Sequence, residues 1–181
     1  MAIKFQRRQP VGLRYKNPLN IKRNPQNNWL GKVKDNKGTF EMFTSFYFGY
    51  RAAMKLIQKY IVIYRCESIK ELIMRWAPPS ENGYEITKGY FKFVAKGCEK
   101  EVDDSVEWKN KDLVCKIVYL MTVFENGSVR AVLEESTPNG PKGMWYPEAL
   151  YPIIEQAYDA VERGGYNGKK NRKKPQSNYF P

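Results

Sequence analysis

The sequence predicts a mainly α-helical domain in which five or six helices surround one central, buried helix, with a single small β hairpin. Three observations support this fold class. Apolar residues recur at helical spacing in several separate segments. Only one stretch, residues 29–43, has the pattern of a hairpin. The chain has 181 residues, of which 42% are hydrophobic and 14% aromatic, enough to bury the core of one domain.

The first two elements are the hairpin and a long helix. Residues 1–28 are rich in Arg, Asn, Gln and Pro, which predicts a loop. Residues 29–33 and 39–43 then flank a turn-forming segment, Asp35-Asn36-Lys37-Gly38. From Ser45 onward, apolar residues at helical spacing predict a helix that ends near Tyr64.

Two shorter helices follow. Ser68 and Glu71 have the spacing of a capping box, which opens a helix. This helix should stop at Trp76, because Pro78 disfavours helical backbone at the residue before it. The next helix should run through Tyr90 and end at Gly97.

The last two helices include the predicted centre of the fold. Residues 113–124 are apolar almost all round, which predicts a buried central helix ending at Glu125. The final helix should cover roughly residues 147–163, and Pro152 is a candidate for its true first turn.

The excess of positive charge lies at the two ends of the chain. Lys and Arg number 31 against 19 Asp and Glu, but residues 35–162 hold 16 basic and 19 acidic residues. We therefore expect a basic arm at 1–11, a domain at 12–163 and a basic tail at 164–181. The tail residues expected to contact nucleic acid or another polyanion, nonspecifically, are Lys169, Lys170, Arg172, Lys173 and Lys174.

The absence of histidine excludes most of the usual hydrolytic machinery. Without it the chain cannot form a Ser-His-Asp triad, a Cys-His pair or an imidazole-ligated zinc site. Cys66, Cys98 and Cys115 are too far apart in sequence for a Cys-x-x-Cys motif and predict buried thiols. We expect no metal, no cofactor, no membrane span and no signal peptide. An enzyme of this composition would depend on carboxylates, Tyr, Lys, Ser or Cys.

Glu125 is the most informative carboxylate. It continues the apolar stripe of Val114, Val118 and Met121, at the C-terminal end of the predicted central helix. Burial and the helix dipole should both raise its pKa. A carboxylic acid kept protonated near neutral pH is what a glycosidase needs as general acid. The alternative is a solvated residue at a frayed helix end.

Two further segments are candidates for binding sugar. Asn17, Asn20 and Trp29 offer amides and an indole to hydroxyl and N-acetyl groups, or else cap turns and anchor the hairpin. Residues 80–82, which are Ser80, Glu81 and Asn82, follow two prolines in a rigid loop, where Ser80 or Asn82 could instead cap the next helix.

Five motifs carry a family resemblance. The chain resembles small phage and prophage proteins, common in the Bacteroidetes and often labelled virion structural or lysozyme-like proteins. Their pattern reads G-[IL]-R-x-N-N-P-x-N-I-[RK], W-x-G, F-x-x-F-x-S-x-x-x-G-x-R-A, W-A-P-P-x-E-N and H-E-N-G. The matching segments here begin at Gly12, Trp29, Phe40, Trp76 and Phe124, so the resemblance covers about residues 12–128.

The resemblance implies a lysozyme-like domain that acts on peptidoglycan. The N-P-x-N-I, W-x-G, F-x-x-F and G-x-R-A series is similar to the segment that follows the catalytic Glu in bacterial glucosaminidases. Here the comparable helix comes later, which implies a circularly permuted domain with Glu125 in the acid position. By the same comparison, residues 80–82 and Tyr90 would line the sugar groove. Phe124 stands where the family usually has histidine, and Gly83–Lys88 contains about three extra residues.

The leading hypothesis is therefore a phage-derived hydrolase or lytic transglycosylase of peptidoglycan glycan strands. A second carboxylate could come from Glu41, Asp35 or Glu81, or the N-acetyl group of the substrate could assist. The alternative is a non-catalytic virion protein that keeps the lysozyme-like fold and binds nucleic acid or other virion proteins. Either protein would be found in the virion, or in the host cytoplasm before assembly or lysis.

Overall fold

The computed structural model describes residues 10–126 and 147–164, and this part of the chain is mainly α-helical. Its seven helices are α1 (Val11–Arg14), α2 (Phe46–Val62), α3 (Ile69–Trp76), α4 (Pro79–Asn82), α5 (Tyr84–Gly97), α6 (Lys111–Asn126) and α8 (Pro147–Gly164). The count exceeds the expected five or six because α1 and α4 are single turns of four residues each. The residues of the basic tail, Lys169–Lys174, and most of the basic arm lie outside the described residues.

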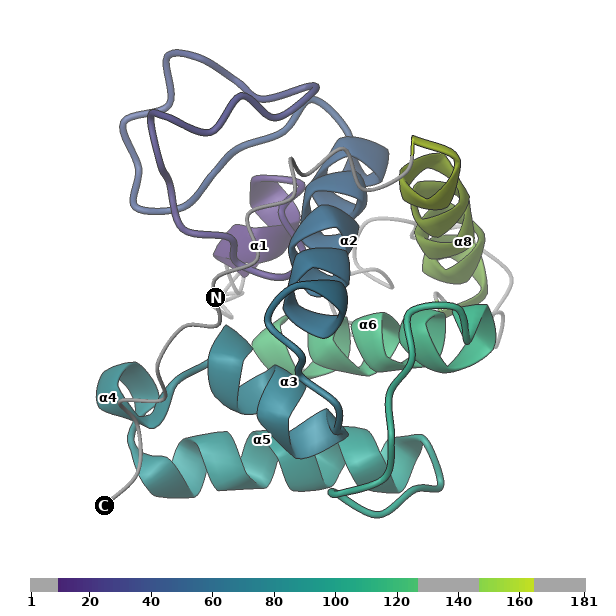
Figure 1. Cartoon of the computed structure of the whole chain (residues 1–181). Coiled ribbons are helices and arrows are strands. Elements are labelled where there is room, and N and C mark those ends of the chain that lie inside the picture. The colour runs from purple at the N-terminus through teal and green to yellow at the C-terminus, as the bar shows by residue number, and fades with distance from the viewer. Residues whose placement is uncertain (1–9, 127–146, 165–181) are drawn as a thin grey trace, which may run out of the picture.

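Helix α6 lies in the middle of the fold, as its apolar sequence predicts. It contacts α1, α5 and α8, and Figure 1 shows it passing between α2 and α8 on one side and α5 on the other. Val114, Ile117, Val118 and Met121 of this helix are almost fully buried. The residue that ends the apolar stripe, Glu125, is therefore placed by a helix whose apolar residues are buried among its neighbours.

Local sequence signals account for where the helices begin. The Ser45 and Ser68 hydroxyls accept hydrogen bonds from the backbone N–H groups of Phe48 and Glu71, and so cap α2 and α3. Helix α3 ends at Trp76, as the two prolines predict, but Pro79 then starts the short helix α4. The predicted rigid loop at residues 80–82 is therefore helical.

The predicted β hairpin is wrong, because the described residues form no strand. Residues 29–43 take part in two isolated bridges: Lys32 pairs with Phe43 inside the segment, and Phe40 pairs with Lys22 outside it. The segment 39–43 divides its backbone hydrogen bonds between two neighbours, for example Glu41 N–H with Ile21 and Val33 N–H with Met42. Each pairing is a single bridge, and a strand needs consecutive bridges. In Figure 1 this part of the chain forms long loops that extend beyond the helices.

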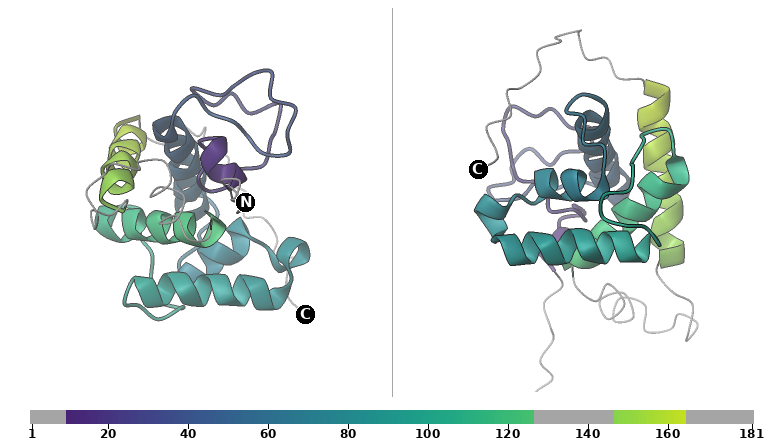
Figure 2. Two further views of the ribbon diagram at one scale, coloured as in Figure 1. Left: turned by 180° about the vertical axis from the view of Figure 1, so that it is seen from behind. Right: turned by 60° about the horizontal axis from the view of Figure 1, so that its bottom comes forward.

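Pro152 does not mark the first turn of the last helix. Helix α8 begins at Pro147, and Pro152 lies inside it with an exposed side chain. Ile154, Ala157 and Val161 of α8 are buried, and the helix packs against both α2 and α6. The two views of Figure 2 show α8 along the side of the molecule that lies away from α4. No described helix is long and apolar enough to span a membrane.

Candidate functional site

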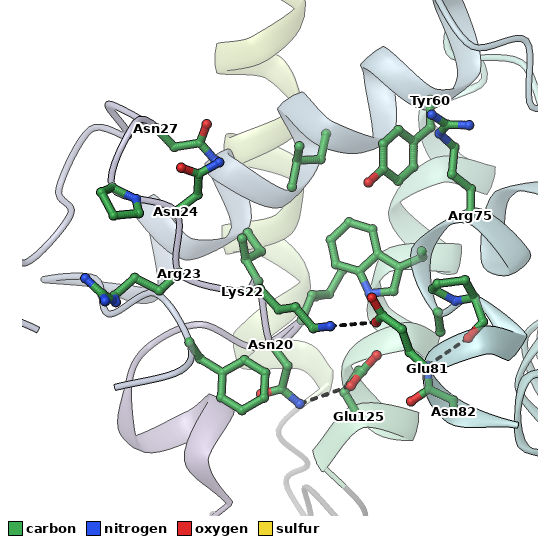
Figure 3. A pocket seen from close by; sticks show the side chains of 18 residues that line it. Asn20, Lys22, Arg23, Asn24, Asn27, Tyr60, Arg75, Glu81, Asn82 and Glu125 are labelled. Carbon is green, nitrogen blue, oxygen red and sulfur yellow. Dashed lines mark hydrogen bonds and ion pairs between the residues drawn. The ribbon is translucent and has the colours of Figure 1, made fainter. Parts of the chain in front are cut away.

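Three segments that are distant in sequence form one groove. The loop at residues 19–27 makes one wall, the C-terminal end of α3 with α4 makes another, and Glu125 at the end of α6 lies between them (Figure 3). The groove has a volume of about 670 Å³, within the usual range for a small-molecule or oligomer site. Its lining combines amides and aromatic rings with charged groups: Asn20, Asn24, Asn27 and Asn82; Phe40, Tyr60 and Trp76; Lys22, Arg23, Arg75 and Glu81.

Glu125 is held in the groove by hydrogen bonds to both carboxyl oxygens. The Asn20 side-chain amide donates to Oε2 at 3.0 Å, and the Tyr90 hydroxyl donates to Oε1 at 3.1 Å. These partners lie 105 and 35 residues away in sequence. The carboxyl group is thus fixed in one orientation at a half-buried position, and it is not at a frayed helix end.

Burial raises the pKa of Glu125 above its ordinary value. Desolvation is the largest cause, and it outweighs the lowering effect of hydrogen bonds from Asn20, Tyr90 and Trp76. The pKa of the Tyr90 hydroxyl is also raised, first by its own burial and then by the neighbouring Glu125. The surroundings of Glu125 therefore favour its protonated form more than water does.

The loop that carries Asn20 is braced by Asn17. The Asn17 side chain is fully buried and forms three hydrogen bonds, donating to the carbonyls of Ile21 and Glu41 and accepting from the Ile21 N–H. It does not line the groove. Asn20 itself has φ 50°, a left-handed conformation that Asn tolerates better than most residues. The N-P-x-N-I motif thus separates two roles, with Asn17 bracing the loop and Asn20 contacting Glu125.

Asn126 and Gly12 complete the junction between this loop and α6. The Asn126 amide donates to the carbonyls of Pro18 and Thr122 at 2.7 and 2.8 Å. A Cβ added to Gly12 would lie 2.5 Å from the Asn126 amide oxygen and 2.6 Å from that of Asn20. Gly12 is therefore required because the two asparagines approach its backbone closely.

The opposite wall places Glu81 and Asn82 on the groove. Glu81 forms an ion pair of 2.6 Å with Lys22, and Figure 3 shows this pair joining the two walls near Glu125. Ser80 is exposed and outside the lining. The predicted segment at residues 80–82 thus contributes two of its three residues.

Trp29 and Tyr90 do not touch the groove directly. Trp29 is half-buried and packs against the hydrophobic core, in agreement with its alternative interpretation as an anchor. Tyr90 is buried behind Glu125, and its ring stacks on Phe124 with centroids 4.0 Å apart. Tyr90 therefore orients the carboxyl group of Glu125.

Of the three candidates for a second carboxylate, only Glu81 lines the groove. Glu41 is fully buried, pairs with Lys32 at 3.0 Å and accepts a hydrogen bond from the Asn24 N–H. It organises the loop wall from inside. Asp35 is exposed and away from the lining. Among the described residues, no group of His, Cys, Asp and Glu could hold a metal ion.

Sequence comparison relates this chain to a phage protein. The chain is 36% identical over 120 residues to "Protein P5" of Pseudoalteromonas phage PM2, an alignment that covers 65% of this chain and 71% of Protein P5. The chain belongs to the family of this phage protein. No protein-family model matches the sequence.

The groove of this chain, a relative of Protein P5, also contains residues that the sequence analysis did not predict. Asn24, Asn27, Leu56, Tyr60 and Arg75 line it without having been predicted as site residues. Tyr60 lies on α2. In the sequence, an aromatic residue at helical spacing that lines a groove cannot be told from one that belongs to the core. Arg75 immediately precedes the W-A-P-P motif, and its place next to a predicted binding segment was the available signal.

Proposed function

We propose that this chain is a phage-encoded glycosidase that cleaves the glycan strands of peptidoglycan, by hydrolysis or transglycosylation, with Glu125 as the general acid. One observation carries the proposal. Glu125 presents a carboxyl group of raised pKa in a large groove, with both oxygens fixed by neighbouring side chains. Cleavage of a glycosidic bond needs such a group to protonate the departing oxygen.

The lining of the groove supports a sugar substrate. Four asparagines offer donors and acceptors suited to hydroxyl and N-acetyl groups, and Tyr60, Trp76 and Phe40 offer apolar ring surface. The phage origin of the related protein supports peptidoglycan in particular, because a phage must cross the wall of its host. A place in the virion, or in the host cell before lysis, is part of the same proposal.

In the proposed reaction a glycosidic oxygen would occupy the groove beside Glu125. The neutral acid gives its proton to that oxygen as the bond to the sugar breaks. Asn20 and Tyr90, which both donate hydrogen bonds to Glu125, then stabilise the carboxylate that remains. The developing positive charge on the sugar needs a second group, which we assign to Glu81 or to the N-acetyl group of the substrate. The sugar carbon then forms its new bond to a water oxygen in hydrolysis, or to a hydroxyl of the same sugar in transglycosylation, and the proton released returns to Glu125.

The test is clearing of a peptidoglycan suspension by the wild-type chain, Glu125→Gln and Glu81→Gln. Glutamine keeps the shape and can still bond to Asn20 and Tyr90, so Glu125→Gln should fold and lose about 10²–10⁴-fold of the rate. Glu81→Gln tests the second group, since it removes the other carboxylate of the described lining. A loss as large as that of Glu125→Gln assigns the second role to Glu81, and a small loss assigns it to the N-acetyl group. Absence of clearing by the wild type would instead favour the non-catalytic alternative.

A further inference from the structure

Arg75 is a cation on the groove wall whose position is fixed by aromatic rings. Its guanidinium carbon lies 3.7 Å from the centroid of the Tyr64 ring and 5.2 Å from that of Tyr60. Tyr60 and Arg75 both line the groove, and Figure 3 shows them together above the Glu81 wall. Stacked arginine is held by the faces of the rings, so its side chain loses little further freedom when it binds a ligand.

The contacts with the rings leave several of the Arg75 N–H donors without a partner among the described residues. A guanidinium has five N–H donors in its plane, at right angles to the direction in which it stacks. The Tyr64 hydroxyl interacts with part of this edge, and none of the ion pairs of the described residues includes Arg75. A planar edge of donors beside a groove matches the geometry of a carboxylate.

The charge of the groove points to the same kind of ligand. Its described lining has three cations, of which only Lys22 has a carboxylate partner, Glu81. Arg23 and Arg75, on opposite sides of the groove in Figure 3, form no ion pair among the described residues. The lining holds two carboxyl groups, Glu81 and Glu125, so its three cations exceed its carboxylates even when Glu125 is ionised. The empty groove is thus net positive and suits an anionic ligand.

We infer that Arg75 is a specificity-determining residue that binds a carboxylate carried by the glycan strand. The inference rests on the proposed function and adds that the substrate must carry a carboxylate near the cleaved bond. In peptidoglycan a carboxylate can come from the lactyl group of a muramic acid without its peptide, or from the stem peptide. Uncharged glycans such as chitin oligosaccharides lack both groups and should bind less well.

The experiment measures binding to four glycans, with the full chain carrying Glu125→Gln so that nothing is cleaved. The probes are peptide-free glycan strands, the same strands after amidation of their carboxyl groups, peptide-bearing strands, and chitin hexasaccharide. Arg75→Gln is then added to this background. The matched control is Lys59→Gln, because Lys59 also lies over the Tyr64 ring, at 5.1 Å, but does not line the groove. Both variants remove one positive charge, so a general attraction to anions affects them equally.

We expect the unmodified peptide-free strands to bind about 10- to 100-fold more tightly than the amidated strands or chitin, the range for a charge-assisted hydrogen bond. Arg75→Gln should abolish this difference, whereas Lys59→Gln should keep it. An Arg75-dependent preference confined to peptide-bearing strands would identify the stem peptide as the source of the carboxylate. Tight binding of all four glycans with no effect of Arg75→Gln would overturn this inference alone. Binding of none of them would overturn the proposed function as well.

Discussion

At the scale of single residues, the raised pKa of Glu125 predicts how stability depends on pH. The folded state binds the Glu125 proton more tightly than the unfolded chain does, so this group stabilises the fold most at pH values below its ordinary pKa of 4.5. That stabilisation is lost as the pH rises through the raised pKa. Glu125→Gln has no such titration, so its stability relative to the wild type should increase from pH 4 to pH 7.

Urea unfolding of both proteins at the two pH values measures this difference. Glu107→Gln is the control, because Glu107 is exposed and forms no ion pair among the described residues. If the wild type gained stability relative to Glu125→Gln as the pH rose, the carboxyl group would be stabilised in its ionised form, and the account of the acid would be wrong.

Gly49 provides a prediction about close approach within the core. A Cβ at this position would overlap the carbonyl oxygen of Lys16, a residue itself held at φ 51°. Gly49→Ala should therefore destabilise the fold by about 1–3 kcal/mol, the usual cost of overpacking. Gly89 is the control, since it is also inside a helix but has open space where a Cβ would go. Gly89→Ala should stabilise the fold by up to about 1 kcal/mol, and equal effects of the two changes would contradict this explanation of Gly49.

The sequence carried enough information to predict the surroundings of some residues and not of others. The partly buried position of Glu125 and its raised pKa could be predicted, because a carboxylate on an apolar helix stripe is itself a local signal. The bracing role of Asn17 could not be predicted, because one of its partners is the backbone of Glu41, 24 residues away. An asparagine that braces a loop and one that contacts a carboxyl group in the groove have the same local pattern, as Asn17 and Asn20 show.

At the scale of elements, the loop at residues 17–41 should depend on Asn17. Asn17→Ala removes three buried hydrogen bonds to backbone groups, and each unsatisfied group costs about 1–3 kcal/mol. We expect a loss of about 3 kcal/mol or more in thermal or urea unfolding, together with weaker glycan binding because Asn20 is no longer held. Asn28→Ala, an exposed change in the same loop, should have little effect on either. Equal stability of the two variants would show that the loop is held by other contacts.

The helices and the hairpin show which elements a sequence can predict. Helices α2, α3 and α5 have local signals at their ends, namely serine caps, prolines and a glycine, and they occur close to where these signals predict them. The hairpin prediction was wrong because of a contact between residues distant in sequence. Residues 39–43 pair partly with residues 21–23, which belong to a segment predicted as plain loop. The sequence pattern of residues 29–43 gives no sign that residues 21–23 compete for the same backbone groups.

At the scale of the whole molecule, the groove results from the packing of distant segments. Glu125 is placed by the central helix, Asn20 by a loop near the start of the chain and Glu81 by a short helix after two prolines. The family resemblance brought these motifs together before any geometry was known. Geometry was needed to show that Trp29, Ser80, Glu41 and Asp35 lie outside the lining, and that Tyr60 and Arg75 belong to it.

The central claim is that Glu125 donates a proton to a glycosidic oxygen. The most direct measurement is mass spectrometry of the soluble fragments released from purified peptidoglycan by the wild type and by Glu125→Gln, at equal concentration of folded protein. The account predicts that the wild type releases fragments cut between sugars. It predicts that Glu125→Gln releases fewer of them by a factor of at least about 10². Fragments cut only in the peptide, equal release by both proteins, or no release by the wild type would contradict it.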